Sequence, residues 1–419
     1  MARLERRRIC WITLGTLVAT LLFVAAVAWY RGAAMQMQPS EHLAHVVRLE
    51  QAGVDQSTVQ PLGWSLAILG RDDEVRRLHF LPAVGPRSPA LDVDKLELFI
   101  VPWKQAIERI AANHRIVMIM ENHFVSKHRE FIGATLETCR DAGFTHYAAE
   151  AIGPMDKSLA KRGYPTSQTG FYTSDPRFGN VLRRALGLDL TVLGYDFRST
   201  THEAREEHAA AALAELLQKN AGARLLVHAG HAHVLKYETK LGERWLASRL
   251  WQKTGIEPFT IWQWSSGPDA HDYAEIVRVL KGRGVSLDEP VLLMPPPPID
   301  CGLQDSPYGL ASVDAIIIHP PDQSVAPAER TPLFPDRMQR IAGRWTSDVW
   351  PVVVSAYKHG EPINAVPLDQ IMLREKEDRF VLWIPARESY EIRVFNSQGV
   401  LKSRVETNAN WITVRLANE

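Results

Sequence analysis

The chain has 419 residues, with 48 basic and 48 acidic side chains and 46% hydrophobic residues. That length and apolar content suffice for one large domain or two to three ordinary ones. The formal net charge is zero, so the chain has no basic excess to attract a nucleic acid, and no nucleic-acid partner is expected. The three cysteines, Cys10, Cys139 and Cys301, have no metal-binding spacing. Either a Cys139–Cys301 disulfide or two buried free thiols would fit the sequence.

Residues 1–31 are expected to form a cytoplasmic stub and a signal anchor. Arg3, Arg6, Arg7 and Arg8 precede Ile9–Tyr30, a run of 22 residues without a charge. A helix of about 20 apolar residues spans a bilayer, and the arginines favour a cytoplasmic N-terminus. The sequence therefore predicts a single-pass membrane protein whose main domain is extracytoplasmic, and periplasmic in a Gram-negative bacterium. The alternative is a cleaved signal peptide, whose apolar region is normally shorter, about 7–15 residues.

Residues 32–98 are expected to form a membrane-proximal linker and entry segment, and residues 99–320 an α/β catalytic-like domain. Apolar runs predict strands at Ile116–Met120, His146–Glu150, Thr191–Gly194, Arg224–Val227, Pro258–Trp262 and Ala315–Ile318. Helical spacing predicts helices near Lys104–Asn113, Lys127–Arg140, residues 200–220, Lys240–Lys253 and Asp272–Lys281. This alternation is typical of an α/β fold with a mostly parallel sheet and helices on both faces.

Residues 321–342 are rich in proline and polar side chains and are expected to be a linker. After them the pattern changes to short strands with turn residues between them. The segment Asn396–Gly399 is a strong hairpin signal. Residues 343–419 are therefore expected to form a small all-β domain, similar to a β-sandwich, that offers a surface for protein or glycan contact.

Acidic and imidazole side chains follow three of the predicted strands. Glu121 and His123 come after the first strand, Glu150 ends the second, and His231 and His233 follow the strand at Arg224–Val227. In parallel α/β sheets, ligands bind in the crevice beyond the carboxyl ends of the strands. Carboxylate and imidazole groups there can bind a metal or move protons.

Four further residues are predicted to contact a substrate at this edge. Arg129 begins the helix after the first strand, and its planar guanidinium suits a carboxylate or phosphate. Asp196 and Arg198 follow Thr191–Gly194, where a structural ion pair is the alternative. Tyr172 lies in a long polar segment, and such segments in compact domains are often functional. For Glu150, the alternative to a catalytic role is a salt bridge to Arg129 or Arg198.

The motifs Glu121-Asn122-His123, the strand ending in Glu150, and Gly230-His231-Ala232-His233-Val234 together resemble the erythromycin esterase, ChaN and TIKI/TraB superfamily. The resemblance covers roughly residues 95–320, and Met120 stands where the family's first motif has a glycine. It implies a hydrolase-like α/β domain in which Glu121, His123, Glu150 and His233 surround one pocket.

The branches of that superfamily imply different chemistry. The TIKI branch resembles metal-dependent peptidases, the esterase branch lactone hydrolases with a histidine base, and the ChaN branch haem-binding proteins. We expect a hydrolase acting on an ester, lactone or peptide bond of a small-molecule or peptide substrate. The sequence leaves open whether this hydrolase depends on a metal; if it does, Glu121, His123, His231 and His233 would hold a divalent ion. The alternatives are a haem- or metal-binding protein without turnover, with a histidine as axial ligand, and an envelope scaffold with a degenerate site.

Overall fold

The computed structural model describes residues 37–78, 99–153, 156–196, 199, 201–239, 242–265, 273–294, 313–321, 326, 328–375, 379–408 and 411–417. The predicted anchor Ile9–Tyr30 and two predicted residues, Arg198 and Cys301, lie outside these ranges. Within the described part of the chain, no helix is both long and apolar enough to cross a membrane. Cys139 is a buried free thiol.

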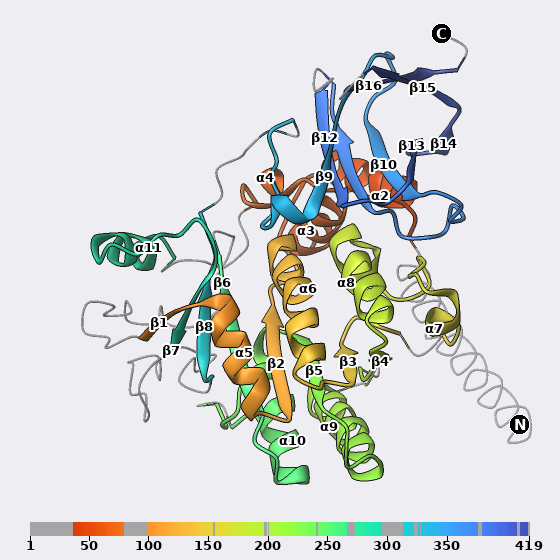
Figure 1. The fold of residues 1–419 in the computed structure, drawn as a ribbon. Helices are drawn as coiled ribbons and strands as arrows, with labels where there is room; N and C mark the ends of the chain where they lie inside the picture. Colours follow the sequence, from red (N-terminus) through yellow and green to blue (C-terminus); the bar gives the residue numbers. More distant parts are fainter. Residues whose placement is uncertain are drawn as a thin grey trace, which may run out of the picture.

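An eight-stranded sheet forms the centre of the larger part of the molecule, in the order β1-β7-β8-β6-β2-β5-β3-β4 (Figure 1). Its strands are β1 (Phe99–Pro102), β2 (Ile116–Glu121), β3 (His146–Ala149), β4 (Thr191–Gly194), β5 (Leu225–Gly230), β6 (Phe259–Trp264), β7 (Val291–Met294) and β8 (Ala315–Ile318). The six strands from β8 to β4 pair in parallel, whereas β7 runs antiparallel to both β1 and β8. The mostly parallel α/β fold predicted from the sequence is confirmed.

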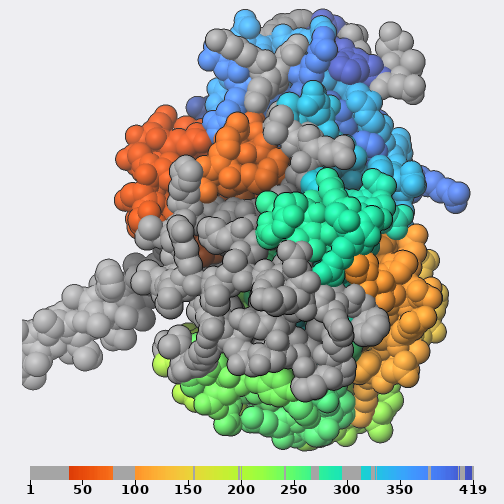
Figure 2. All heavy atoms as spheres, turned by 90° about the vertical axis from the view of Figure 1, so that its left-hand side faces the viewer, coloured from red at the N-terminus to blue at the C-terminus, as the bar shows by residue number. Residues whose placement is uncertain are grey.

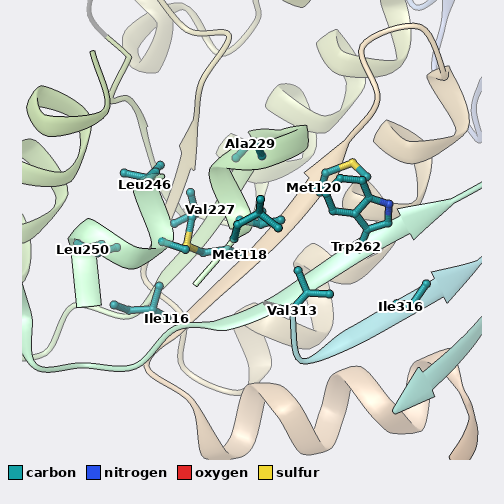
Figure 3. Close-up of a cluster of buried hydrophobic side chains, with 14 of the residues drawn as sticks. Ile116, Met118, Met120, Val227, Ala229, Leu246, Leu250, Trp262, Val313 and Ile316 are labelled. Carbon is teal, nitrogen blue, oxygen red and sulfur yellow. The ribbon is translucent and has the colours of Figure 1, made fainter. Parts of the chain in front are cut away.

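Helices cover both faces of this sheet and bury a core on each side. The helices of the larger part are α5 (Trp103–Asn113), α6 (Ser126–Asp141), α7 (Leu159–Arg162), α8 (Pro176–Gly187), α9 (His202–Lys219), α10 (Leu246–Thr254) and α11 (Tyr273–Gly282). Apolar side chains of α5, α6 and α8 share one core with the sheet, and those of α9, α10 and α11 share the other. Figure 3 shows part of the second core, where Met118 and Met120 of β2 join the cluster that contains Leu246 and Leu250 of α10.

The order of the connections places a topological switch point between β2 and β5. The chain leaves β2 through α6, on one face of the sheet, to reach β3. It leaves β5 through α10, on the opposite face, to reach β6, which lies on the far side of β2. Neighbouring parallel strands whose outgoing helices lie on opposite faces mark the switch point where α/β proteins bind ligands.

Two four-stranded sheets, in the orders β11-β10-β13-β14 and β12-β9-β16-β15, form the C-terminal part. Their strands are β9 (Met338–Trp345), β10 (Val352–Lys358), β11 (Asp369–Leu373), β12 (Arg379–Pro385), β13 (Tyr390–Asn396), β14 (Gly399–Leu401), β15 (Ser403–Asn408) and β16 (Trp411–Leu416). All pairs are antiparallel except β9 and β16. Apolar side chains from both sheets share one core. Strand β9 begins inside the stretch 321–342 that the sequence indicated as linker.

Three helices occupy the N-terminal described segment, within the stretch 32–98. They are α2 (Pro39–Ala52), α3 (Val59–Ile68) and α4 (Asp72–Val75). Their apolar side chains pack against Val353, Met372 and Phe395 of the C-terminal sheets. Figures 1 and 2 show these helices (red to orange) at the junction between the C-terminal sheets (blue) and the larger α/β part. The domain limits drawn from the sequence stay a prediction.

Candidate functional site

Sheet pairing places the ends of β2, β5 and β3 side by side. Glu121, the last residue of β2, is the register partner of Gly230, the last residue of β5. Glu150 directly follows β3, and its backbone N–H donates to the carbonyl of His228 in β5, at 3.1 Å. The sheet alone therefore brings Glu121, Gly230 and Glu150 to one edge.

Glu121 and His123 form a hydrogen-bonded dyad at the end of β2. The Nδ1 of His123 lies 2.6 Å from Oε1 of Glu121. An ionised carboxylate only accepts hydrogen bonds, so Nδ1 carries a proton, and in the neutral form of the ring Nε2 is the acceptor. The Glu121 side chain is 1% exposed, whereas that of His123 is 18% exposed. Glu121 is thus the buried member of the dyad and His123 the more exposed one.

Buried partners hold Glu121 in its ionised form. Arg129 donates from Nε to Oε2 at 2.7 Å and from Nη2 to Oε1 at 3.1 Å, and Nε2 of His228 lies 2.9 Å from Oε2. Burial alone would raise the pKa of Glu121, but Arg129 and then His228 outweigh it and hold that pKa well below its ordinary value. Arg129 also donates to Asp175 at 2.5 Å. Its guanidinium is therefore surrounded by groups of the protein.

The ring of His123 lies between Tyr172 and the backbone of β5 at Gly230. Tyr172 stacks on it, with ring centroids 3.9 Å apart and an angle of 11° between the planes. On the other side the ring meets the backbone of β5. A Cβ placed on Gly230 would lie 2.8 Å from His123 Nε2 and 3.0 Å from Glu150 Oε2. Both atoms therefore lie next to the Gly230 backbone, in the space that a side chain at this position would need.

Glu150 joins the dyad to a second group of charges. Its Oε2 accepts the backbone N–H of Gly230 at 2.6 Å, and its Oε1 accepts from Arg205 at 2.5 Å. Burial alone would raise the pKa of Glu150, but His233, and after it His123 and Arg205, hold it well below its ordinary value. The salt bridge expected as an alternative role for Glu150 exists, but Arg205 makes it rather than Arg129.

His233 lies between two carboxylates. Its Nδ1 is 2.9 Å from Glu206 Oε2, and its Nε2 is 3.4 Å from Glu150 Oε1. Burial would lower the pKa of His233, but Glu150 and Glu206 outweigh it and raise the pKa to about 10. At neutral pH this ring is an imidazolium, so it suits the stabilisation of negative charge rather than the removal of a proton.

The other predicted residues lie around this centre. Asp196 accepts both Nε and Nη2 of Arg205, at 2.7 and 2.8 Å. The ring of His231 faces Trp262, with centroids 5.8 Å apart. Met120 is buried in the core cluster that also contains Trp262 of β6.

Sequence reasoning did not single out Asp175, Arg205 or Glu206. Asp175 carries a readable signal, since an Asp before Pro176 is a typical helix N-cap, and its side chain accepts the backbone N–H of Arg177. Arg205 and Glu206 lie in the first turns of α9, which begins at the same edge of the sheet. The start of a helix that follows a strand lies near the strand ends, so residues in its first turns can reach the site. The sequence does not show which groups they contact, because Glu150 lies 55 residues from Arg205 and His233 lies 27 residues from Glu206.

Two of the predicted metal ligands already have partners within the protein. Glu121 is engaged by Arg129 and His123, and both nitrogens of His233 face carboxylates. Among the residues that the structure describes, no three His, Cys, Asp or Glu side chains are arranged to hold a metal. Because Glu121 and His233 are engaged by other groups of the protein, this arrangement does not fit a shared metal.

Two hollows of the described surface lie away from this centre. The larger, of about 390 Å³, lies between the α/β part and the C-terminal sheets, and the smaller, of about 340 Å³, lies beside α9 and α10. Neither is lined by His123, Glu150 or His233. The candidate site is thus defined by its charges and hydrogen bonds, and the larger cavity is a separate feature.

No protein-family model and no curated protein matches the chain. Solved structures show distant similarity. The type III effector HopBA1 is 14% identical, with a TM-score of 0.32 over 42% of this chain and 87% of that chain. RRSP, a MARTX toxin effector domain from Vibrio vulnificus, is 13% identical, with a TM-score of 0.30 over 49% of this chain and 46% of its own. ChaN of Campylobacter jejuni, described with cofacial haem, is 9% identical, with a TM-score of 0.27 over 53% and 96%. No residue role is carried over from these distant likenesses.

Proposed function

We propose that this protein is a membrane-anchored, extracytoplasmic hydrolase that acts on an ester, lactone or peptide bond. The observation that supports this most is the 2.6 Å contact between Glu121 and His123. It leaves Nε2 of His123 as a base beyond the carboxyl ends of β2, β3 and β5. The imidazolium of His233 lies on the other side of Glu150, 3.4 Å from its carboxylate. Membership of the superfamily that the motifs resemble is part of the proposal.

In this proposal His123 activates a water molecule. Its Nε2 takes the proton as the water attacks the substrate carbonyl, and Glu121 stabilises the resulting imidazolium, as a buried carboxylate does in a catalytic triad. The imidazolium then returns this proton to the leaving alcohol or amine as the C–O or C–N bond to the carbonyl carbon breaks. The negative charge that develops on the carbonyl oxygen needs a donor nearby. His233 supplies it, because its proton is retained at neutral pH and its contact with Glu150, at 3.4 Å, is long enough to be exchanged for a substrate oxygen.

Arg129 is assigned a positioning role instead of a substrate contact. Its side chain is 1% exposed, and it donates to Glu121, to Asp175 and to the carbonyl of His123. It therefore fixes the carboxylate that orients the base. Tyr172, stacked on His123, holds the ring plane and borders the substrate.

The test is turnover of an ester, lactone and peptide panel by the full-length protein in a mild detergent. His123→Ala and Glu121→Gln are expected to lower kcat at least about 100-fold, the usual worth of a positioned general base. His146→Gln is the matched control, because His146 lies at the opposite end of β3. Equal loss in all three variants, or activity of His123→Ala at the wild-type level, would count against the proposal. Activity should persist in a chelator.

The same preparation separates the alternatives. A haem-binding protein without turnover would be purified with a strong visible absorption band that His123→Ala removes. A scaffold with a degenerate site would show neither band nor turnover. For the proposed membrane topology, a reporter fused after residue 419 should be active only outside the cytoplasm, and cytoplasmic activity would contradict it.

A further inference from the structure

A second histidine, His128, bonds the turn that carries His123. Strand β2 ends at Glu121, and His128 lies in the first turn of α6, where its side chain is buried. Its Nδ1 accepts the backbone N–H of Asn122, at 2.9 Å. Asn122 stands between Glu121 and His123 in the chain. The bond therefore fixes the backbone at the point on which the placement of the dyad depends.

The hydrogen bonds of His128 allow one protonation state of its ring. A backbone N–H can only donate, so Nδ1 of His128 carries no proton and the ring proton lies on Nε2. That nitrogen lies 3.0 Å from Oγ of Ser265, which follows β6 and accepts the proton. Burial, and after it His319, hold the pKa of His128 well below its ordinary value, which keeps the ring neutral. His128 is thus protonated on Nε2, whereas His123 carries a proton on Nδ1, facing Glu121.

Further bonds hold the backbone on both sides of this contact. The carbonyl of Met120 accepts Nε2 of Gln263, at 2.6 Å, and the carbonyl of His123 accepts Nη2 of Arg129, at 3.1 Å. Gln263 also donates to the carbonyl of His128, at 3.2 Å. The end of β2 and the start of α6 are therefore tied to each other and to β6.

We propose that His128 is a positioning residue for the dyad of Glu121 and His123. In a capping box the third residue of a helix bonds the backbone N–H of the N-cap. Here the N–H of the N-cap, Val125, already donates to the carbonyl of Asn122, at 2.9 Å. His128 reaches past the N-cap and bonds the amide inside the dyad. Its effect on turnover rests on the function proposed above, whereas its effect on the dyad does not.

The two ring tautomers test this without turnover. In the full-length protein, carrying isotope-labelled histidine in mild detergent at pH 7, the ring-nitrogen shifts should show His128 protonated on Nε2 and His123 protonated on Nδ1. His128→Phe keeps an aromatic ring but removes the acceptor, and it should shift the Nδ1–H signal of His123. His128→Asn keeps an acceptor close to the position of Nδ1 and should restore that signal. A proton on Nδ1 of neutral His128, or an unchanged His123 signal in His128→Phe, would overturn the proposal.

Turnover by the same variants measures what the positioning contributes. His128→Phe should lower kcat at least about tenfold with KM little changed, because misplacing a catalytic group by about 1 Å can cost about 100-fold. His128→Asn should regain most of the loss. His146→Phe, at the opposite end of β3, is the control and should change neither kcat nor the His123 signal.

The possible results separate this role from the proposed hydrolysis. Equal losses of kcat in His128→Phe and His146→Phe would mean that any buried histidine matters, and would count against positioning. Should His128→Phe fail to fold, as circular dichroism would show, the wild-type tautomers and the kcat of His128→Asn decide. A wild-type protein that shows both tautomers but turns over no substrate would contradict the proposed function and leave the positioning of the dyad standing.

Discussion

At the scale of single residues, the centre is built from charges that stabilise one another only as a set. Arg129 is the clearest case, because its buried guanidinium neutralises both Glu121 and Asp175. Removing one partner of a buried ion pair leaves an uncompensated charge and costs about 3–5 kcal/mol. The same contact that orients the proposed base is therefore expected to stabilise the fold.

Arg129→Met should lower the free energy of unfolding by about 3–5 kcal/mol, because two buried carboxylates lose their counterion. Arg140→Gln, on the same helix α6 but exposed, should change it by no more than about 0.5 kcal/mol. Urea unfolding of the two variants at pH 7 measures the difference. Equal stability of the two variants would show that the buried cation is not required.

His233 makes stability depend on pH in a defined direction. Its pKa is raised from 6.5 to about 10 in the folded protein, so the folded state keeps a proton that the unfolded chain releases. The stabilisation is fully present below about pH 6.5 and is lost as the pH rises through about 10. His233→Gln should therefore be less stable than the wild type at pH 6.5, and the two should approach each other by pH 10. Denaturation midpoints at pH 6.5, 8 and 10 check this, and a constant difference would contradict the raised pKa.

At the scale of elements, the close approach of β2, β3 and β5 depends on one glycine. Gly230 has an ordinary backbone conformation, with φ of −71°, so an alanine there causes no backbone strain. The added Cβ would instead meet His123 Nε2 and Glu150 Oε2, at 2.8 and 3.0 Å. The glycine is needed for space rather than for flexibility.

Gly230→Ala should abolish the proposed activity and lower the free energy of unfolding by about 1–3 kcal/mol, the usual cost of overpacking. Gly187→Ala at the end of α8 is the control, since a Cβ there meets nothing within 4 Å. It should be neutral or stabilising by up to about 1 kcal/mol. Turnover and urea unfolding of both variants decide the matter. A fully active Gly230→Ala enzyme would mean that His123 and Glu150 can move apart without loss.

The strand ends could be predicted from the sequence, whereas their partners could not. Apolar runs that stop at a charged residue locate the ends of β2 and β3, and the parallel-sheet rule then places Glu121 near Glu150. The short strands β1 and β7 gave no such signal. The contacts of Arg205 with Glu150 and of Arg129 with Asp175 join residues 55 and 46 positions apart, and they depend on how helices pack after the strands form.

At the scale of the whole molecule, the helices α2–α4 connect the α/β part to the C-terminal sheets. Arg71, 2% exposed, donates to the carbonyl of Met372 in β11, at 3.2 Å, and Gln370 donates to the carbonyl of Ile68 in α3, at 2.8 Å. On the other side, Trp64 of α3 stacks on Phe124 and meets Tyr172 edge-on, with ring centroids 6.0 and 5.9 Å apart. The N-terminal helices therefore lie between the C-terminal sheets and Tyr172, the residue that stacks on His123.

Val353 and Val354 are neighbours in β10 that face opposite sides. Val354 belongs to the core between the two sheets, whereas Val353 packs with Leu43 and Leu62 of the N-terminal helices. Val353→Asp would bury a carboxylate without a partner, so we expect it to lower the free energy of unfolding by more than about 3 kcal/mol. It should also release the helices α2 and α3 from the sheet. Val400→Asp on β14 is the matched control, because Val400 is 48% exposed and the change there should cost no more than about 0.5 kcal/mol.

Hydrogen exchange of the backbone amides in α2 and α3 reads out the release directly. In Val353→Asp these amides should exchange much faster than in the wild type, while those of α6 and β2, which pack in other cores, keep their protection. In Val400→Asp all four elements should exchange at wild-type rates. Wild-type protection of α2 and α3 in Val353→Asp would show that the helices are held by the α/β part alone. The C-terminal sheets would then not be needed to hold the helices that contact Tyr172 beside His123.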